Sequence, residues 1–320
     1  MGYDWDEMDE RRWTPIVALF AANFISVTGE ALASVAILWF VLSTTGSAAQ
    51  TGVTGFVLVT PVILATFFGG AFVDRVGYKR VSILADLASG VTVALIPLLY
   101  VTVGLPFWQL LILVFLTNLL DAPGTTARSA LIPELAAQAG MSLERASALQ
   151  DSVSRATRMI GAPVGGLLTA AIGPINVLWL DAASFAVSAV LVAFFVSQTG
   201  DSPVRRQPTR YLDEVQEGLN FFRKDRLIMT VVTALMLANF LDAGFVLVFA
   251  PVFSERVYGA ETGSIQLGLM QGVFGAGALV GSILMGTVGR RLSRRWLLSG
   301  GLAIIALRWF CWRSRRRSGC

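Results

Sequence analysis

The feature that most limits how this chain can fold is a series of long apolar runs separated by short polar segments. A helix needs about 20 predominantly apolar residues to cross the hydrocarbon core of a membrane. Eight full runs lie at about 15–42, 51–73, 81–104, 107–127, 155–173, 176–197, 228–253 and 264–288. A ninth run begins near Trp296. Only 14% of the 320 residues are charged, whereas soluble domains usually carry about 25%. The sequence therefore predicts an all-α, polytopic membrane protein.

The segments between these runs differ in charge on the two sides of the expected membrane. Those expected outside are uncharged or, in Val252–Ser264, of mixed charge, whereas those expected inside are rich in Lys and Arg. Because Lys and Arg accumulate in cytoplasmic loops, this pattern predicts a multi-pass protein of the cell membrane with a cytoplasmic N-terminus. Membrane topology thus explains the net charge of +4, and no nucleic-acid partner is expected.

The basic segment between the second and third runs has a defined pattern of glycines and charges. The pattern G-x-x-x-D-R-x-G-x-K-R is formed by Gly70, Asp74, Arg75, Gly77, Lys79 and Arg80. The glycines allow close backbone approach and a sharp turn, and Asp74 can meet the positive N-terminal end of a neighbouring helix. The pattern predicts a tight basic turn that joins two membrane helices. The alternative is a basic hairpin that only fixes orientation.

Two carboxylates lie near the middle of the predicted spans, Glu30 in the first run and Asp242 in the seventh. Ionisable residues at this depth are costly and mark functional sites by default. Ala22–Phe24 recurs as Ala238–Phe240, 216 residues later, so Asp242 corresponds to Ser26, one helical turn before Glu30. Residues four apart share a helix face, and we expect both carboxylates to face a central cavity and exchange protons there. The alternative is a packing role, with each carboxylate hydrogen-bonded to Ser, Thr or Asn.

Three further aspartates lie nearer the ends of the predicted spans. Asp121, also a candidate for proton coupling, is expected to pair with Arg128 at the cytoplasmic end or to be linked to Asp74. Asp86 begins the third run just after the basic turn and is expected to join the cytoplasmic charges. Asp181 is expected to be a structural cap or a polar contact.

The fifth run contains a cluster of small residues around a proline, namely Gly161, Pro163, Gly165 and Gly166. Gly161 and Gly165 form a small-x-x-x-small face that permits close contact with another helix. Pro163 removes one backbone donor and bends the helix. We therefore expect a close and slightly kinked helix contact at this depth.

No cofactor or enzymatic chemistry is indicated by the sequence. The chain has no histidine, and both cysteines, Cys311 and Cys320, stand in the last ten residues. His-ligated metal sites and imidazole proton relays are therefore excluded within this polypeptide. A phosphate-binding loop is also lacking, so the chain carries no ATP motor of its own. We predict no metal, no cofactor and no enzyme, and an ion channel is improbable because no filter or pore helix is visible.

The basic turn at 70–80 resembles the signature loop between helices 2 and 3 of the major facilitator superfamily of secondary transporters. The cluster at 161–166 resembles the glycine–proline motif of its antiporter branches, although Ala162 separates Gly161 from Pro163. Together with the segments 121–134 and Leu180–Phe185, these two motifs make the chain resemble bacterial drug exporters of the macrolide-efflux and siderophore-exporter type. This resemblance implies twelve spans in two halves, alternating access, and export of an amphipathic small molecule driven by proton entry, with lipid as the surroundings.

The end of the chain departs from that family pattern. We expect a complete six-helix N-terminal half at 1–197, a cytoplasmic linker at 198–227 and a partial C-terminal half at 228–307. Residues 308–320 form an aberrant basic tail, which suggests a frameshift or a premature stop near codon 308. The alternative to an exporter is therefore a non-transporting membrane fragment, either a pseudogene product or part of a split protein whose partner chain is unknown.

Overall fold

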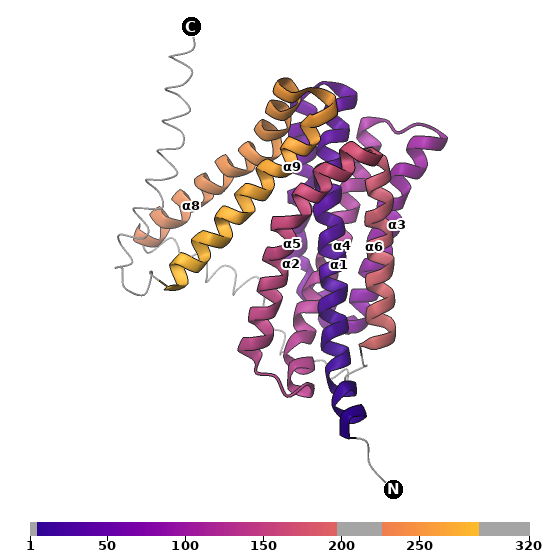
Figure 1. Ribbon diagram of the computed structural model, residues 1–320, viewed down its shortest axis with the longest axis vertical. Helices are drawn as coiled ribbons and strands as arrows, with labels where there is room; N and C mark the ends of the chain where they lie inside the picture. Colours follow the sequence, from indigo (N-terminus) through magenta and orange to yellow (C-terminus); the bar gives the residue numbers. More distant parts are fainter. Residues whose placement is uncertain (1–4, 197–225, 288–320) are drawn as a thin grey trace.

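The computed structural model describes residues 5–196 and 226–287, and all regular structure in these ranges is helical (Figure 1). This confirms the all-α prediction. The first range forms a bundle of six helices, which are α1 (Trp5–Thr45), α2 (Ala48–Val76), α3 (Tyr78–Thr102), α4 (Phe107–Gln138), α5 (Leu143–Ile172) and α6 (Pro174–Phe195).

Short turns join these helices, so that each helix runs antiparallel to the next (Figure 1). Gly77 alone separates α2 from α3, and its φ of 95° is a conformation that only glycine adopts without steric cost. Gly173 alone likewise separates α5 from α6, and its φ is 85°. The predicted basic turn is thus a single residue, and the charges on either side of it belong to helices.

Helices α4 and α5 extend well beyond the apolar runs from which they were predicted. The run at 107–127 continues as helix to Gln138, and the run at 155–173 is preceded by helix from Leu143. Polar side chains do not interrupt a helix whose polar face is solvated. Apolar length therefore predicted the apolar part of each of these two helices and missed the extensions beyond it.

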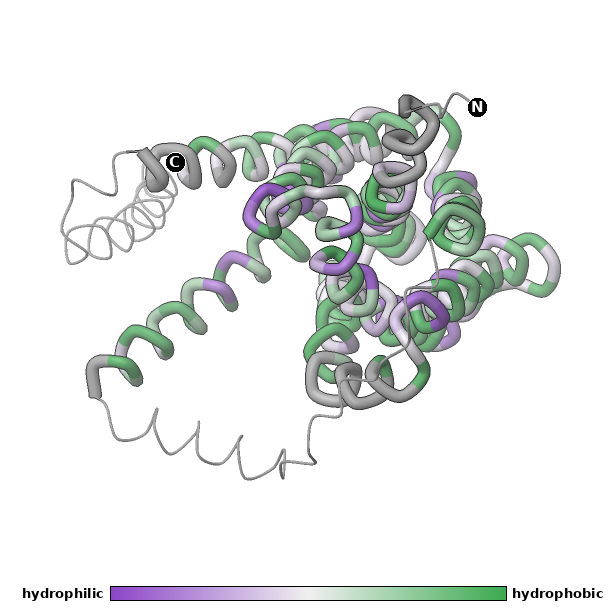
Figure 2. Tube along the Cα trace, turned by 90° about the horizontal axis from the view of Figure 1, so that it is seen from below, coloured by the Kyte–Doolittle hydropathy of each residue, from purple (hydrophilic) through white to green (hydrophobic). Residues whose placement is uncertain are grey.

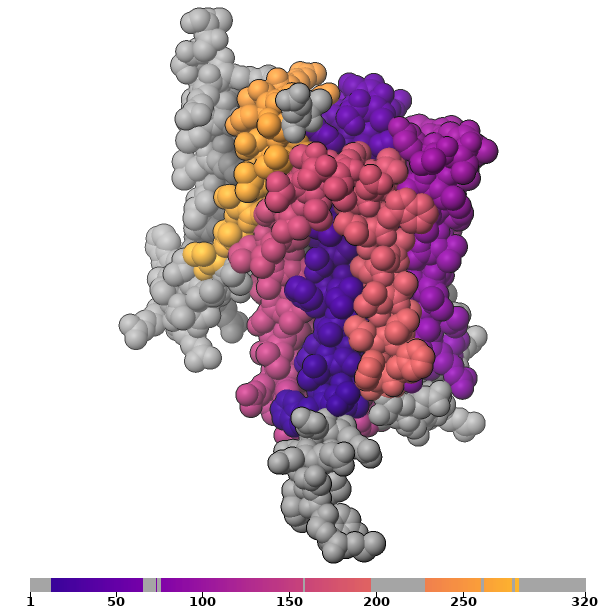
Figure 3. Space-filling view, turned by 45° about the vertical axis from the view of Figure 1, so that its right-hand side comes forward, coloured from indigo at the N-terminus to yellow at the C-terminus, as the bar shows by residue number. Residues whose placement is uncertain are grey.

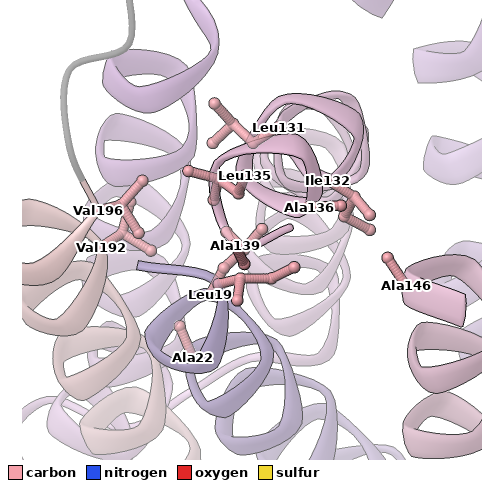
Figure 4. Close-up of a cluster of buried hydrophobic side chains, with 11 residues drawn as sticks. Leu19, Ala22, Leu131, Ile132, Leu135, Ala136, Ala139, Ala146, Val192 and Val196 are labelled. Atoms are coloured by element: carbon pink, nitrogen blue, oxygen red, sulfur yellow. The ribbon is translucent and has the colours of Figure 1, made fainter. Parts of the chain in front are cut away.

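The bundle has a buried apolar cluster toward each of its ends. At the end that holds the Gly77 turn, side chains of α1, α4, α5 and α6 form a buried cluster (Figure 4), which includes Leu19, Leu131, Leu135, Val192 and Val196. A second cluster at the opposite end joins α1, α3, α4 and α6. On the face shown in Figure 3, α1 lies between α5 and α6.

The second described range forms two long helical arms that diverge from a common turn (Figure 2). Helix α8 (Arg226–Gly244) continues through the π-helical segment η1 (Phe245–Phe249) into α9 (Ala250–Thr287). Gly259, with φ 73° and ψ −175°, breaks α9 and reverses the chain. The segment Val252–Ser264, expected to be a loop, is therefore helical on both sides of one glycine. Figures 1 and 2 show both arms extending away from the bundle.

Within the described residues, six helical segments are long and apolar enough to cross a membrane, and α5 is not one of them. The first half of α5 carries Glu144, Arg145, Asp151 and Arg155, which lowers its mean hydropathy. Most of the expected linker, the ninth run and the basic tail lie outside the described residues.

Candidate functional site

A cavity of about 780 Å³ is lined by all six helices of the bundle together with η1 and α9. Apolar side chains such as Ile37, Val93, Leu247 and Phe274 make up most of its wall. Its polar and charged lining consists of Glu30, Ser34, Thr117, Asn118, Asp151, Ser154, Arg155, Asp181 and Gln271. Drug-sized ligands occupy pockets of about 300–1,000 Å³ with this mixture of apolar walls and few polar groups.

Glu30 of α1 reaches the cavity, as expected from the sequence. The hydroxyl of Ser26, one helical turn earlier, donates a hydrogen bond to Glu30 Oε1 at 3.3 Å. Within the described part of the chain, no Lys or Arg side chain forms a salt bridge with Glu30. The carboxyl group is thus oriented by a neutral donor and remains available to a proton or a ligand.

Within the described structure, Asp242 does not line the cavity with Glu30. Asp242 lies in α8, is half-buried, and does not belong to the described residues that line the cavity. Val246 and Leu247, about one turn later, do line it. The π-helical segment Phe245–Phe249 begins three residues after Asp242. Its wider turn changes which of the later residues share a face with Asp242.

A buried ion-pair network joins α3, α4 and α6. The guanidinium of Arg128 lies 2.5 Å from Asp86 Oδ1 and 3.5 Å from Asp121 Oδ1. The hydroxyl of Ser188 donates to Asp86 Oδ2 at 2.7 Å. Both Arg128 and Asp86 are fully buried. Asp121 therefore lies beside Arg128, whereas Asp86 is an interior partner of Arg128 and not a member of the surface charges near the basic turn.

The glycine and charge pattern at 70–80 is divided between two helices. Gly70, Asp74 and Arg75 lie in helix α2, and for these three residues the described structure includes the backbone only. Lys79 Nζ donates to the carbonyl oxygen of Ala193 in the last turn of α6 at 2.9 Å. A cation is favourable at a helix C-terminus, so Lys79 ties the α2–α3 turn to the end of α6. Arg80 is exposed.

The small residues of α5 contact helices on two sides. A Cβ added at Gly161 would lie 2.7 Å from Ala31 Cβ, and one at Gly165 would lie 3.0 Å from Leu32 Cα. On the other side, a Cβ at Gly166 would lie 3.0 Å from the Cα of Gly268 in α9.

Pro163 belongs to this second contact, because its ring packs against Gly272 of α9. The cluster therefore allows α5 to pack closely against α1 and against the second described range.

Sequence reasoning missed Asp181 as a lining residue. It is 2% exposed, lies in α6 and lines the same cavity as Glu30. The signal was present, because a charged residue inside a 22-residue apolar helix is the observation that singled out Glu30. Among the described residues, no group of three or more His, Cys, Asp or Glu side chains is placed to hold a metal ion.

A family model described as the Major Facilitator Superfamily matches residues 19–314. The chain belongs to this superfamily. Among curated proteins, the multidrug efflux pump Tap of Mycolicibacterium fortuitum is 28% identical over 285 residues, which covers 88% of this chain and 69% of Tap. Tap of Mycobacterium tuberculosis H37Rv is 28% identical over 300 residues, covering 92% and 70%. Macrolide efflux protein A of Streptococcus pyogenes is 20% identical over 290 residues, covering 90% and 70%.

A solved structure has the same fold. The nucleoside transporter NupG, in a D323A mutant, superposes with a TM-score of 0.70 at 11% sequence identity. The match covers 86% of this chain and 68% of that one. The predicted superfamily and its membrane-spanning helical fold are thereby confirmed.

Proposed function

We propose that this chain supplies the substrate cavity of a secondary transporter that exports drug-like, amphipathic small molecules in exchange for protons. The observation that carries the proposal is the 780 Å³ cavity, whose mostly apolar wall contains the carboxyl group of Glu30. An amphipathic molecule gains free energy by burying its apolar body against such a wall. The names of the efflux relatives support export as the direction.

Glu30 would carry the coupling proton. A carboxyl group surrounded by apolar walls is stable when it is neutralised, either by a proton or by a cationic group of a ligand. Proton and substrate can therefore exclude each other at this position. If the cavity is exposed alternately to each side of the membrane, this exclusion makes inward movement of a proton drive outward movement of substrate.

The proposed direction of transport also requires an orientation of the chain in the membrane. The N-terminus and the Gly77 turn lie at the same end of the bundle (Figure 1). We assign this end to the cytoplasmic side of the cell membrane, because the first turns of α3 and α5, which lie there, carry Lys79, Arg80 and Arg145. The exposed lining residues Asp151 and Arg155 lie in the first half of α5, toward the same end. The cavity would then accept substrate from the cytoplasm.

Proton flux in proteoliposomes tests this function directly. The purified full chain is reconstituted with a trapped pH-sensitive dye, a pH gradient is imposed, and erythromycin is added as the probe. We expect erythromycin-dependent proton movement with the unaltered chain and none with Glu30→Gln. The matched control is Glu134→Gln, because Glu134 is exposed on α4 and does not line the cavity; its flux should be unchanged.

The second candidate function is a membrane chain that does not transport by itself. Its supporting observation is the exposed apolar surface of α8, on which Met236 and Phe240 are 69% and 75% exposed. If correctly inserted chain produces no proton movement with erythromycin or with other macrolides, transport by this polypeptide alone is refuted. This second candidate, which includes a subunit that requires a partner chain, would then take its place.

A further inference from the structure

Asp181 is a second buried carboxylate in the wall of the cavity, and it approaches α1 beside Glu30. A Cβ added at Gly29 would lie 2.5 Å from Asp181 Oδ1. The side chain of Ser184 and the carboxyl group of Asp181 therefore together occupy the space that a side chain at position 29 would fill. Only the lack of a side chain on Gly29 allows α6 to place this group against the α1 backbone, at the residue that precedes Glu30.

Asp181 has little local compensation for its charge. The hydroxyl of Ser184 lies 3.5 Å from Asp181 Oδ1, but it lies 2.8 Å from the main-chain oxygen of Asp181. A serine hydroxyl has one proton to donate, and the shorter distance indicates that Ser184 donates it to the main-chain oxygen of Asp181. Within the described residues, Asp181 forms no salt bridge. A side chain that is 98% buried and lines a cavity thus lacks a cation.

The neighbouring charges do not supply that cation. From α4, Asp121 and Arg128 face the same interior: Asp121 adds a further negative charge near both carboxyl groups, and Arg128 is paired with Asp86 and Asp121. From α5, Asp151 and Arg155 line the cavity and are exposed. The part of the cavity wall formed by α1 and α6 therefore presents two carboxyl groups, those of Glu30 and Asp181, with no described cation between them.

We propose that Glu30 and Asp181 form one proton-binding site, in which the two carboxyl groups hold a single proton between them. The proposal rests on the proposed function and deepens it. Two carboxylates that share a water-poor site cannot both ionise without strong mutual repulsion. The proton passes between water and the pair without any other bond being made or broken. Because α1 and α6 each contribute one group, proton occupancy affects the contact between these two helices.

Labelling with dicyclohexylcarbodiimide tests the pair without requiring transport. This reagent modifies protonated carboxyl groups in apolar surroundings, and peptide mapping by mass spectrometry identifies the modified residue. The purified full chain in detergent should take up about one label at pH 7, divided between Glu30 and Asp181. In Asp181→Asn, one repulsion that favours protonation of Glu30 is removed while the apolar surroundings remain, so labelling of Glu30 should be lost at a lower pH than in the unaltered chain.

Two further variants make this result specific. Glu30→Gln should shift the loss of Asp181 labelling to lower pH in the same way, because a shared proton makes the effect reciprocal. Asp151→Asn, a matched change at an exposed carboxylate of the same cavity, should leave both labels unchanged. All comparisons use the monodisperse fraction from size-exclusion chromatography, so that an unfolded variant is not scored.

The proposal is overturned if Glu30 is labelled equally at every pH in the unaltered chain and in Asp181→Asn, or if both residues are labelled on the same molecule. It is also overturned if neither residue is labelled at any pH at which the chain stays folded. A chain that labels as expected but moves no protons with erythromycin refutes the proposed function and leaves the shared site intact. The two failures are therefore distinguishable.

Discussion

At the scale of single residues, the most demanding feature is Arg128, a fully buried cation in a helix of a membrane protein. Removing one partner of a buried ion pair leaves the other charge uncompensated and typically costs on the order of 3–5 kcal/mol. We therefore expect Arg128→Met to destabilise the chain by that order, as measured by thermal unfolding in detergent. Arg128→Met combined with Asp86→Asn should recover part of the loss, because Asp121 is then the one carboxylate of this network that is left without its cation.

The pair of variants also separates packing from charge. If the double variant is no more stable than Arg128→Met alone, the volume of the Arg128 side chain matters more than its charge. Arg155→Met is the matched control, because Arg155 is exposed at the cavity and exposed charges contribute little to stability. It should unfold at the temperature of the unaltered chain.

At the scale of helices, the crossing of α5 and α9 depends on glycines that face each other's backbone. A Cβ at Gly166 would lie 3.0 Å from Gly268 Cα and 3.1 Å from its nitrogen, whereas a Cβ at Gly277 would have no neighbour within 4 Å among the described residues. Overpacking of a close contact costs about 1–3 kcal/mol, so Gly166→Ala should lower the unfolding temperature. Gly277→Ala should leave it unchanged or raise it, since Ala is the better helix former. Equal effects of both substitutions would contradict the close crossing.

Features that depend on neighbouring residues in the sequence could be predicted, whereas features that depend on contacts between distant segments could not. Apolar run length is a local property, and it identified the membrane-crossing parts of the helices. Glu30 could be found because a carboxylate in an apolar run is conspicuous. The pairing of Asp86 with Arg128, 42 residues apart, depends on how α3 and α4 are placed side by side. The approach of Asp181 to α1 depends on Gly29 in another helix.

At the scale of the whole molecule, the contacts between the bundle and the second described range gather at one end. Trp39 of α1 packs against Gly263, Leu247 of η1 packs against Gly55 of α2, and Gly166 crosses Gly268. These residues lie toward the end opposite the Gly77 turn. The two parts are thus closed at that end, and the exposed lining residues lie toward the other. The arrangement corresponds to a cavity that is open on the side of the N-terminus.

Cysteine labelling tests this arrangement together with the orientation of the chain. In a background of Cys311→Ser and Cys320→Ser, Ser154→Cys places a thiol on the cavity wall, and Thr45→Cys places one at the exposed end of α1 on the other side. A membrane-impermeant maleimide should label Ser154→Cys in inside-out vesicles and Thr45→Cys in intact cells. Reversed labelling would mean that the N-terminus is outside. Labelling of Ser154→Cys from both sides would mean that the contacts at Trp39, Gly55 and Gly166 do not seal the cavity, and a chain in that condition could not couple substrate export to proton entry.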